Sequence, residues 1–305
     1  MNARIAGLSM FGVFGLLACA TSCGQTPGHP VLFDVALEAL PGDDGDTARF
    51  TSATGWTVEL DRAVIAIGPL YLYENPPQAR EADTSRPLHA LLDFHGLDFD
   101  TLVDWIEPSA HAHPGDNLFD GGAIKGEMLD QVAFDLIGEP GQASPGKAGL
   151  GLARGVAGSV GSVSVILWEP SGGTLGPADL LEDHHAYVIG RASKEGVTIE
   201  FAGGIQIPDI GVKRRVDGLA AAFELADDGL LIVGVDPAAW FDQANFDLLP
   251  TQSVQDEQGR WQISEDTQVS IAWNLALHRP YAWTIRWEAD AASIADFPLI
   301  PGVMQ

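Results

Sequence analysis

Trp56-Thr-Val-Glu-Leu-Asp61 and Tyr281-Ala-Trp-Thr-Ile-Arg-Trp-Glu288 are the two stretches that decide the fold. In both, apolar and polar residues alternate with a period of two, so that Trp283, Ile285 and Trp287 fall on one side. Successive side chains of an extended chain point to opposite faces, and this period is therefore typical of a strand with one buried face. We predict two half-buried strands, one near each end of the folded part.

Similar apolar segments recur along the chain, and turn signals such as Asp227-Asp228-Gly229 separate them. The further predicted strands are 31–40, 64–73, 129–137, 162–168, 185–191, 197–202, 219–225, 230–235 and 268–277. One helical turn could form over Pro237–Phe241, and 86–107 could hold a short helix. Many strands with short connections predict a mainly β protein, an antiparallel β-sandwich, with one long irregular insertion at about 74–125.

The composition excludes several classes of function. The chain has 42 acidic and 16 basic residues, a net charge of −26, which disfavours nucleic acids and anionic membrane surfaces as partners. Hydrophobic residues make up 46% of it, enough for a folded core. The sequence contains no Gly-x-Ser-x-Gly nucleophile motif, and no glycine-rich phosphate loop joins a predicted strand to a helix. We therefore expect a protein that is not an enzyme.

The N-terminus has the pattern of an export signal. Arg4 is the only charge before an apolar run of 14 residues, Ile5 to Ala18, which is too short to span a bilayer permanently. The run ends Leu16-Leu17-Ala18-Cys19, and this ending resembles the lipobox of bacterial lipoproteins. The resemblance implies cleavage before Cys19 and a lipid on that cysteine, and Ala20 then implies retention at the outer membrane. An ordinary secretory signal, or lipidation of Cys23 instead, are the alternatives.

The predicted organisation has three parts: a signal peptide over 1–18, a tether over 19–30, and a single β-sandwich domain over 31–305. Cleavage would leave 15 basic and 42 acidic residues, a net charge of −27. No cysteine follows Cys23, so the folded domain has neither a disulfide nor a thiolate metal site.

Histidines supply the best candidate for chemistry. In extended backbone the side chains of His111 and His113 point the same way and could converge on one ion, and Pro114 favours that conformation. Asp116 and Glu127 are close enough in sequence to add oxygen ligands.

A second histidine pair, His184-His185, begins a predicted strand, where only one of the two can face a given site. We select His185 as the distant ligand. Imidazole ligands without thiolates favour Zn²⁺ or Cu²⁺ as the bound ion, and otherwise no cofactor is expected. The alternatives are that His111 and His113 are merely exposed, and that Asp43-Asp44-Gly45-Asp46 is a solvated turn or a calcium site.

Four fragments resemble uncharacterised acidic lipoproteins of Gram-negative bacteria. They are Gly55–Asp61, the His-x-His-Pro-Gly segment at 111–115, Gly126-Glu127-Met128-Leu129 and Val235–Phe241. They cover about a tenth of the chain, and the resemblance implies no particular activity.

The leading hypothesis is a lipid-anchored envelope protein that binds a divalent transition ion through its histidines. The rival is a non-catalytic structural or interaction module without metal, whose protein partner the sequence does not identify. A hydrolase using paired carboxylates is a third class, but accidental pairs are common among 42 acidic residues.

Overall fold

The computed structural model describes residues 28–42, 45–77, 121–138, 146–207, 214–289 and 297–300, and it is mainly β, as predicted. The strands are β1 (Pro30–Ala39), β2 (Arg49–Thr51), β3 (Thr57–Tyr73), β4 (Ile124–Met128), β5 (Val132–Asp135), β6 (Lys147–Val156), β7 (Gly158–Leu167), β8 (Ala186–Lys194), β9 (Val197–Ile205), β10 (Arg215–Leu225), β11 (Leu230–Val235), β12 (Trp261–Ile263) and β13 (Trp283–Glu288). The helical elements are η2 (Ala178–Leu180), α2 (Pro237–Trp240), η4 (Phe246–Leu248), α3 (Leu249–Gln252), α4 (Gln268–Leu277) and η5 (Pro280–Ala282).

All thirteen strands belong to one hydrogen-bonded sheet, so the prediction of a sandwich of two packed sheets is not confirmed. The sheet is mixed rather than antiparallel throughout, because β1 pairs with β11 and β12 pairs with β9 in parallel. The other ladders are antiparallel.

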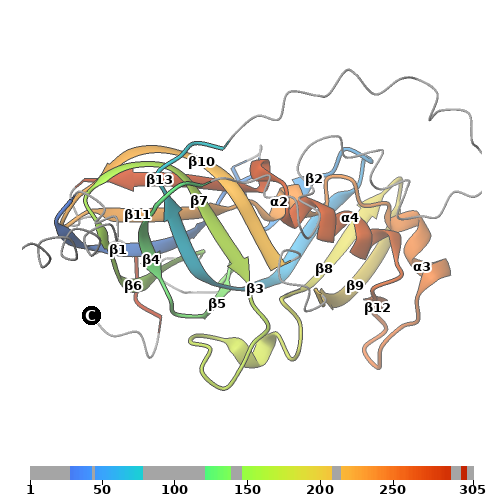
Figure 1. The fold of residues 1–305 in the computed structure, drawn as a ribbon. Helices are drawn as coiled ribbons and strands as arrows, with labels where there is room; N and C mark the ends of the chain where they lie inside the picture. The colour runs from blue at the N-terminus through green and yellow to red at the C-terminus, as the bar shows by residue number, and fades with distance from the viewer. Residues whose placement is uncertain are drawn as a thin grey trace, which may run out of the picture.

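The long strand β3 organises the sheet. It merges the two segments predicted at Trp56–Asp61 and 64–73 into one strand of 17 residues. Along one edge it pairs in turn with β2, β5 and β4, and along the other it pairs first with β8 and then with β7. The N-terminal end of β3 therefore carries β2, β8 and, beyond β8, β9 and β12, whereas its C-terminal end pairs with β4 and β7 (Figure 1).

At that second end the sheet curls around the core. Strands β10, β7, β3, β4, β6, β1, β11 and β13 follow one another in hydrogen-bonded order. Aromatic packing brings the first and last of these strands together: Phe223 of β10 stacks on Trp287 of β13 with ring centroids 4.9 Å apart, and Phe33 of β1 meets the same indole edge-on at 5.8 Å. The rings fill the space that the curled sheet encloses.

At the other end, helices cover the sheet (Figure 1). Trp273 of α4 stacks on Trp240 of α2 at 5.5 Å and contacts Phe241 at 5.3 Å, and Phe241 in turn contacts Phe201 of β9 at 5.9 Å. We call this group the aromatic cluster. Its members are Phe50, Trp56, Phe201, Trp240, Phe241, Phe246 and Trp273.

The prediction of a strand at 268–277 is wrong, because this segment is the helix α4. Its buried residues include Val269, Ala272, Trp273 and Ala276, a spacing of three and four that a helix requires. The side chain of Thr267 caps it by accepting a hydrogen bond from the Ser270 amide, at 3.1 Å. The helical turn predicted at Pro237–Phe241 is confirmed as α2. Within the described ranges, no helix is long and apolar enough to cross a membrane.

The predicted insertion is described only at its two ends. The amides of Glu74 and Asn75 donate to the carbonyls of Ala123 and Gly121, at 3.0 and 2.9 Å, so the two ends lie side by side. Strand β4 begins at Ile124, inside the range predicted to be irregular, and residues 78–120 lie outside the described part.

Candidate functional site

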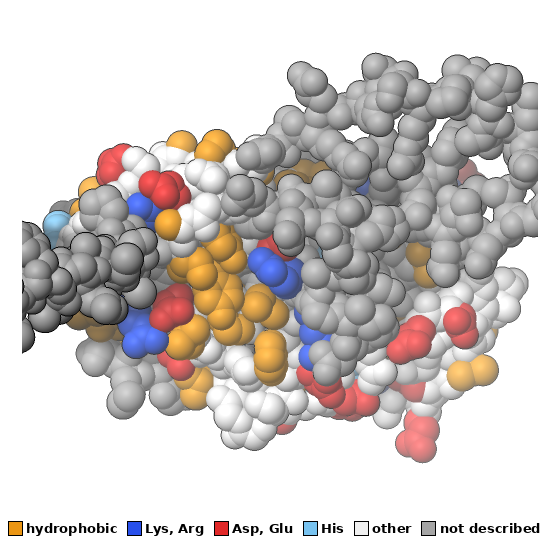
Figure 2. Space-filling model, viewed as in Figure 1, with side chains coloured by type: hydrophobic (Ala, Val, Ile, Leu, Met, Phe, Trp, Pro, Cys, Tyr) orange, Lys and Arg blue, Asp and Glu red, His pale blue; other side chains and the backbone are white. Residues whose placement is uncertain are grey.

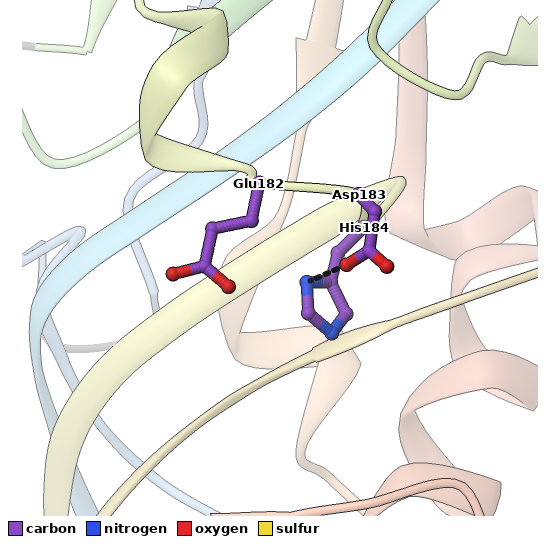
Figure 3. A group of neighbouring side chains, drawn as sticks. All are labelled: Glu182, Asp183 and His184. Carbon is purple, nitrogen blue, oxygen red and sulfur yellow. Dashed lines mark ion pairs between the residues drawn. The ribbon is translucent and has the colours of Figure 1, made fainter.

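A tight turn before β8 gathers three titratable side chains. The Leu181 amide donates to the Ala178 carbonyl at 3.1 Å, and the His184 amide donates to the Leu181 carbonyl at 2.8 Å. This turn presents Glu182 and Asp183, which are exposed, beside a half-buried His184 (Figure 3). One ligand atom from each of the three lies within 4.8 Å of the others.

The ring of His184 is held in one orientation. Its Nδ1 lies 3.1 Å from the Leu181 carbonyl and 3.3 Å from Oδ1 of Asp183, both of them acceptors, so Nδ1 carries the hydrogen. Nε2 therefore has a free lone pair, and it lies on the side of the ring away from Asp183 (Figure 3). A carbonyl or carboxylate on one ring nitrogen, with the other nitrogen free, is the arrangement found in metal-binding histidines.

The position of His184 depends on Gly204 of β9. A Cβ added at Gly204 would lie 2.3 Å from Cγ of the histidine ring, which is closer than any real contact. Only glycine leaves room for the imidazole against this strand. The ring also contacts Tyr187, with centroids 5.7 Å apart, and its side chain is 22% exposed.

His185, the ligand selected from the sequence, has a different environment. It is 2% exposed, and its Nδ1 accepts a hydrogen bond from the Ile207 amide at 3.2 Å. Its Nε2 is buried, without a hydrogen-bond partner among the described residues. Burial, followed by the positive charge of Arg214, lowers the pKa of His185 to about 4, although Glu169 opposes the shift. Of the two adjacent histidines, His184 is the one that can offer a nitrogen to an ion at the surface.

Glu127, another predicted ligand, pairs with Arg154 instead. Its Oε1 accepts from Nε and Nη2 of Arg154, at 2.9 and 2.7 Å, across the β4–β6 ladder. Glu127 lies opposite Tyr71 on one edge of β3, whereas the His185 carbonyl bonds the Ala66 amide on the other edge. Five residues of strand separate these positions, about 16 Å, so one ion cannot bind both.

The other predicted site residues lie outside the described part of the chain. They are Cys19, His111, His113 and Asp116. The structure therefore neither joins them to His184 nor separates them from it. Glu182 and Asp183 are the two residues of the turn that the sequence analysis overlooked, although two acids directly before a histidine pair are visible in the sequence.

An apolar surface lies on the outer side of β1 and β6. Leu32, Leu129 and Leu152 are each about half exposed, at 54, 49 and 47%. We call these three residues the leucine face. They line a shallow groove of about 310 Å³ together with Met128 and the Glu127–Arg154 ion pair. Figure 2 shows a patch of hydrophobic side chains on the visible face of the molecule, with acidic and basic side chains touching each other beside it.

Comparison with protein-family models, with curated proteins and with solved structures finds no match to this chain.

Proposed function

We propose that this protein is held in the bacterial envelope by a lipid on Cys19 and that it binds one divalent transition ion, Zn²⁺ or Cu²⁺. The protein ligands are His184, His111 and His113. The observation that carries the proposal is the ring of His184, whose Nδ1 lies beside the Leu181 carbonyl and Asp183, while its Nε2 makes no hydrogen bond to any described residue and the side chain is 22% exposed.

The choice between the adjacent histidines follows from their environments. A ligand nitrogen must reach an ion with its lone pair. His185 uses the Nδ1 lone pair to accept the Ile207 amide, and its Nε2 is enclosed. In His184 the Nδ1 faces two acceptors and carries the hydrogen, so the lone pair is on Nε2. His184 therefore replaces His185 in the proposed site.

The chemistry of the donors favours Zn²⁺ and Cu²⁺. Three imidazole nitrogens form a borderline ligand set that suits both ions, and no thiolate is present in the chain after Cys23. Asp183 acts as a positioning residue, because its carboxylate orients the ring and makes the imidazole a better donor.

Calorimetric titration of Zn²⁺ and Cu²⁺ into the detergent-solubilised full chain tests the ion site. His184→Ala and the double variant His111→Ala/His113→Ala should each lower the affinity at least tenfold. His29→Ala is the matched control, because His29 is an exposed histidine that contacts Asp227 at 3.6 Å in a different part of the surface. Equal binding by wild type and His184→Ala contradicts the proposed ligand.

Asp183 provides a finer test of the same site. Asp183→Asn should weaken binding about tenfold, the lower end of the range for a residue that orients a ligand. Asp179→Asn removes another exposed carboxylate of the same segment and should leave the affinity unchanged. If the two variants lower affinity equally, the acids act only through general surface charge.

The anchor has an independent test. Cys19→Ser should move the protein out of the membrane fraction, and Cys23→Ser should leave it there. The reverse result would assign the lipid to Cys23, and retention of a cleaved Cys19→Ser protein would contradict the anchor at Cys19.

A second candidate function, a non-catalytic interaction module without metal, is favoured by the leucine face. Three exposed leucines on adjacent strands form a contact surface that ion binding does not explain.

A further inference from the structure

The leucine face is built by strand register. Leu32 of β1 lies opposite Arg154 of β6, and Asp34 lies opposite Leu152, so the two leucines are diagonal neighbours on the outer side of the sheet. Leu129 follows directly after β4, whose Glu127 pairs with Arg154. The apolar surface therefore extends over β1, β6 and the end of β4, and it carries the Glu127–Arg154 pair together with the carboxylates of Asp34 and Asp130.

The tether enters the domain next to this surface. The Ala157 amide donates to the His29 carbonyl at 3.0 Å, and Pro30 lies opposite Val156, which fixes the first described residues to the end of β6. Leu32 comes two residues after Pro30. From Cys19 to Pro30 the chain advances eleven residues, which span at most about 38 Å when fully extended. A lipid on Cys19 would thus hold this end of the domain close to a bilayer.

We propose that the leucine face rests on the lipid surface to which the protein is anchored, with the three leucines in the interfacial region. This inference rests on the proposed lipid at Cys19. The three side chains project from a shallow surface, as contact with a fluid bilayer permits. Arg154 is 67% exposed beside them, where its apolar stem can lie along the leucines while its guanidinium meets headgroup phosphates.

The charge of the protein defines the kind of membrane. After cleavage the chain has a net charge of −27 and is repelled by anionic lipid, so the contact must be apolar and must favour zwitterionic headgroups. We expect the contact to persist at high salt and to weaken as anionic lipid is added.

A site-specific fluorophore tests the contact in the lipidated full chain. In a Cys23→Ser background, Leu152→Cys is labelled with bimane, and the matched control is Val254→Cys, because Val254 is 72% exposed in the turn before β12. Both proteins are placed in phosphatidylcholine vesicles whose acyl chains carry a nitroxide quencher. Quenching at 152 should be at least twofold stronger than at 254, and it should fall when phosphatidylglycerol is added.

The outcomes separate the two proposals. Protein that stays with the vesicles but shows equal quenching at both positions overturns the membrane contact alone. Protein that leaves the vesicles overturns the anchor and the contact together. A label at 152 that is shielded from aqueous iodide but not quenched by the lipid also overturns the membrane contact, and it assigns the leucine face to contact between copies of this chain.

Discussion

The two ends of β3 differ in what covers the sheet. At the β8–β9 end, Trp273 of α4 packs against Trp240 of α2 and against Phe241, and Phe241 packs against Phe201, so the sheet face becomes core. At the other end, β1 and β6 present Leu32 and Leu152 outward, about half exposed. Apolar residues on one surface are covered by described helices and on the other remain accessible. The same kind of residue therefore forms core in the first place and exposed surface in the second.

The largest expected effect is at the covered end. Trp273 is fully buried and contacts Trp240 and Phe241, so Trp273→Ala should lower the free energy of unfolding by about 3–5 kcal/mol, measured by denaturant titration. Trp273→Phe is the control, because it keeps most of the ring and removes an indole N–H that has no partner among the described residues. It should lower stability by only about 1 kcal/mol. Equal losses in the two variants would show that packing of the cluster is not what the helix contributes.

The sequence predicted the strands of this end better than its helix. Val269, Ile271 and Trp273 alternate with polar or small residues, so the segment Gln268–Leu277 fits a strand as well as a helix. The cap at Thr267 and the buried Ala272 and Ala276 are what identify it as a helix. Strand β6 was missed because its glycines conceal the alternation. A Cβ at Gly155 would lie 2.5 Å from the Lys125 carbonyl, and such a tertiary contact is not visible in a sequence.

The second effect is a pH dependence at the start of β8. The folded-state pKa of His185, about 4, lies below the usual histidine value of about 6.5, so the unfolded chain binds a proton first. The stability that this buried neutral ring contributes is complete above pH 6.5 and is lost as the pH falls to about 4, with a magnitude of about 3 kcal/mol. His185→Gln cannot titrate. As the pH falls from 6.5 to 4, the free energy of unfolding of wild type should therefore decrease relative to that of His185→Gln. A difference between the two proteins that does not change with pH would show that His185 is not held neutral.

A smaller effect is expected on β1 itself, away from the leucines. Glu38 is 8% exposed and accepts a hydrogen bond from Nη1 of Arg286 at 2.6 Å. This bond is the largest reason why the pKa of Arg286 is raised. Because the arginine is half exposed, Glu38→Gln should lower stability by only about 1 kcal/mol. Arg191→Gln is the control, because it removes a more exposed ion pair, that of Arg191 on β8 with Glu59 on β3, and it should lower stability less. An equal loss in the two variants would show that the Glu38–Arg286 pair contributes no more than an ordinary surface ion pair.

The smallest effect belongs to the exposed surface. Leu32→Ser and Leu152→Ser should each change the free energy of unfolding by no more than about 0.5 kcal/mol, because both side chains are about half exposed in the folded protein. Thermal unfolding of each variant beside wild type gives the answer. A loss near that of Trp273→Ala would mean that the leucine face is core, and the comparison between the two ends would fail.

The candidate site was only partly predictable. The pair His184-His185 was visible in the sequence, and because adjacent residues of a strand face opposite sides, only one of them was expected to serve a site. It did not show which one, because the choice depends on the turn at Leu181 and on the Ile207 amide, which reaches His185 from 22 residues away. Glu127 was chosen for its position in the sequence, and its actual partner, Arg154, lies on a neighbouring strand. The roles of Cys19, His111, His113 and Asp116 stay predictions.

Elemental analysis of the full chain, purified from membranes without a chelating tag, tests the central claim most directly. The account predicts one zinc or copper ion per chain in the wild type and in His29→Ala, and a content at least tenfold lower in His184→Ala. An equal metal content in wild type and His184→Ala, or wild-type protein free of both metals, would contradict the claim that His184 holds an ion.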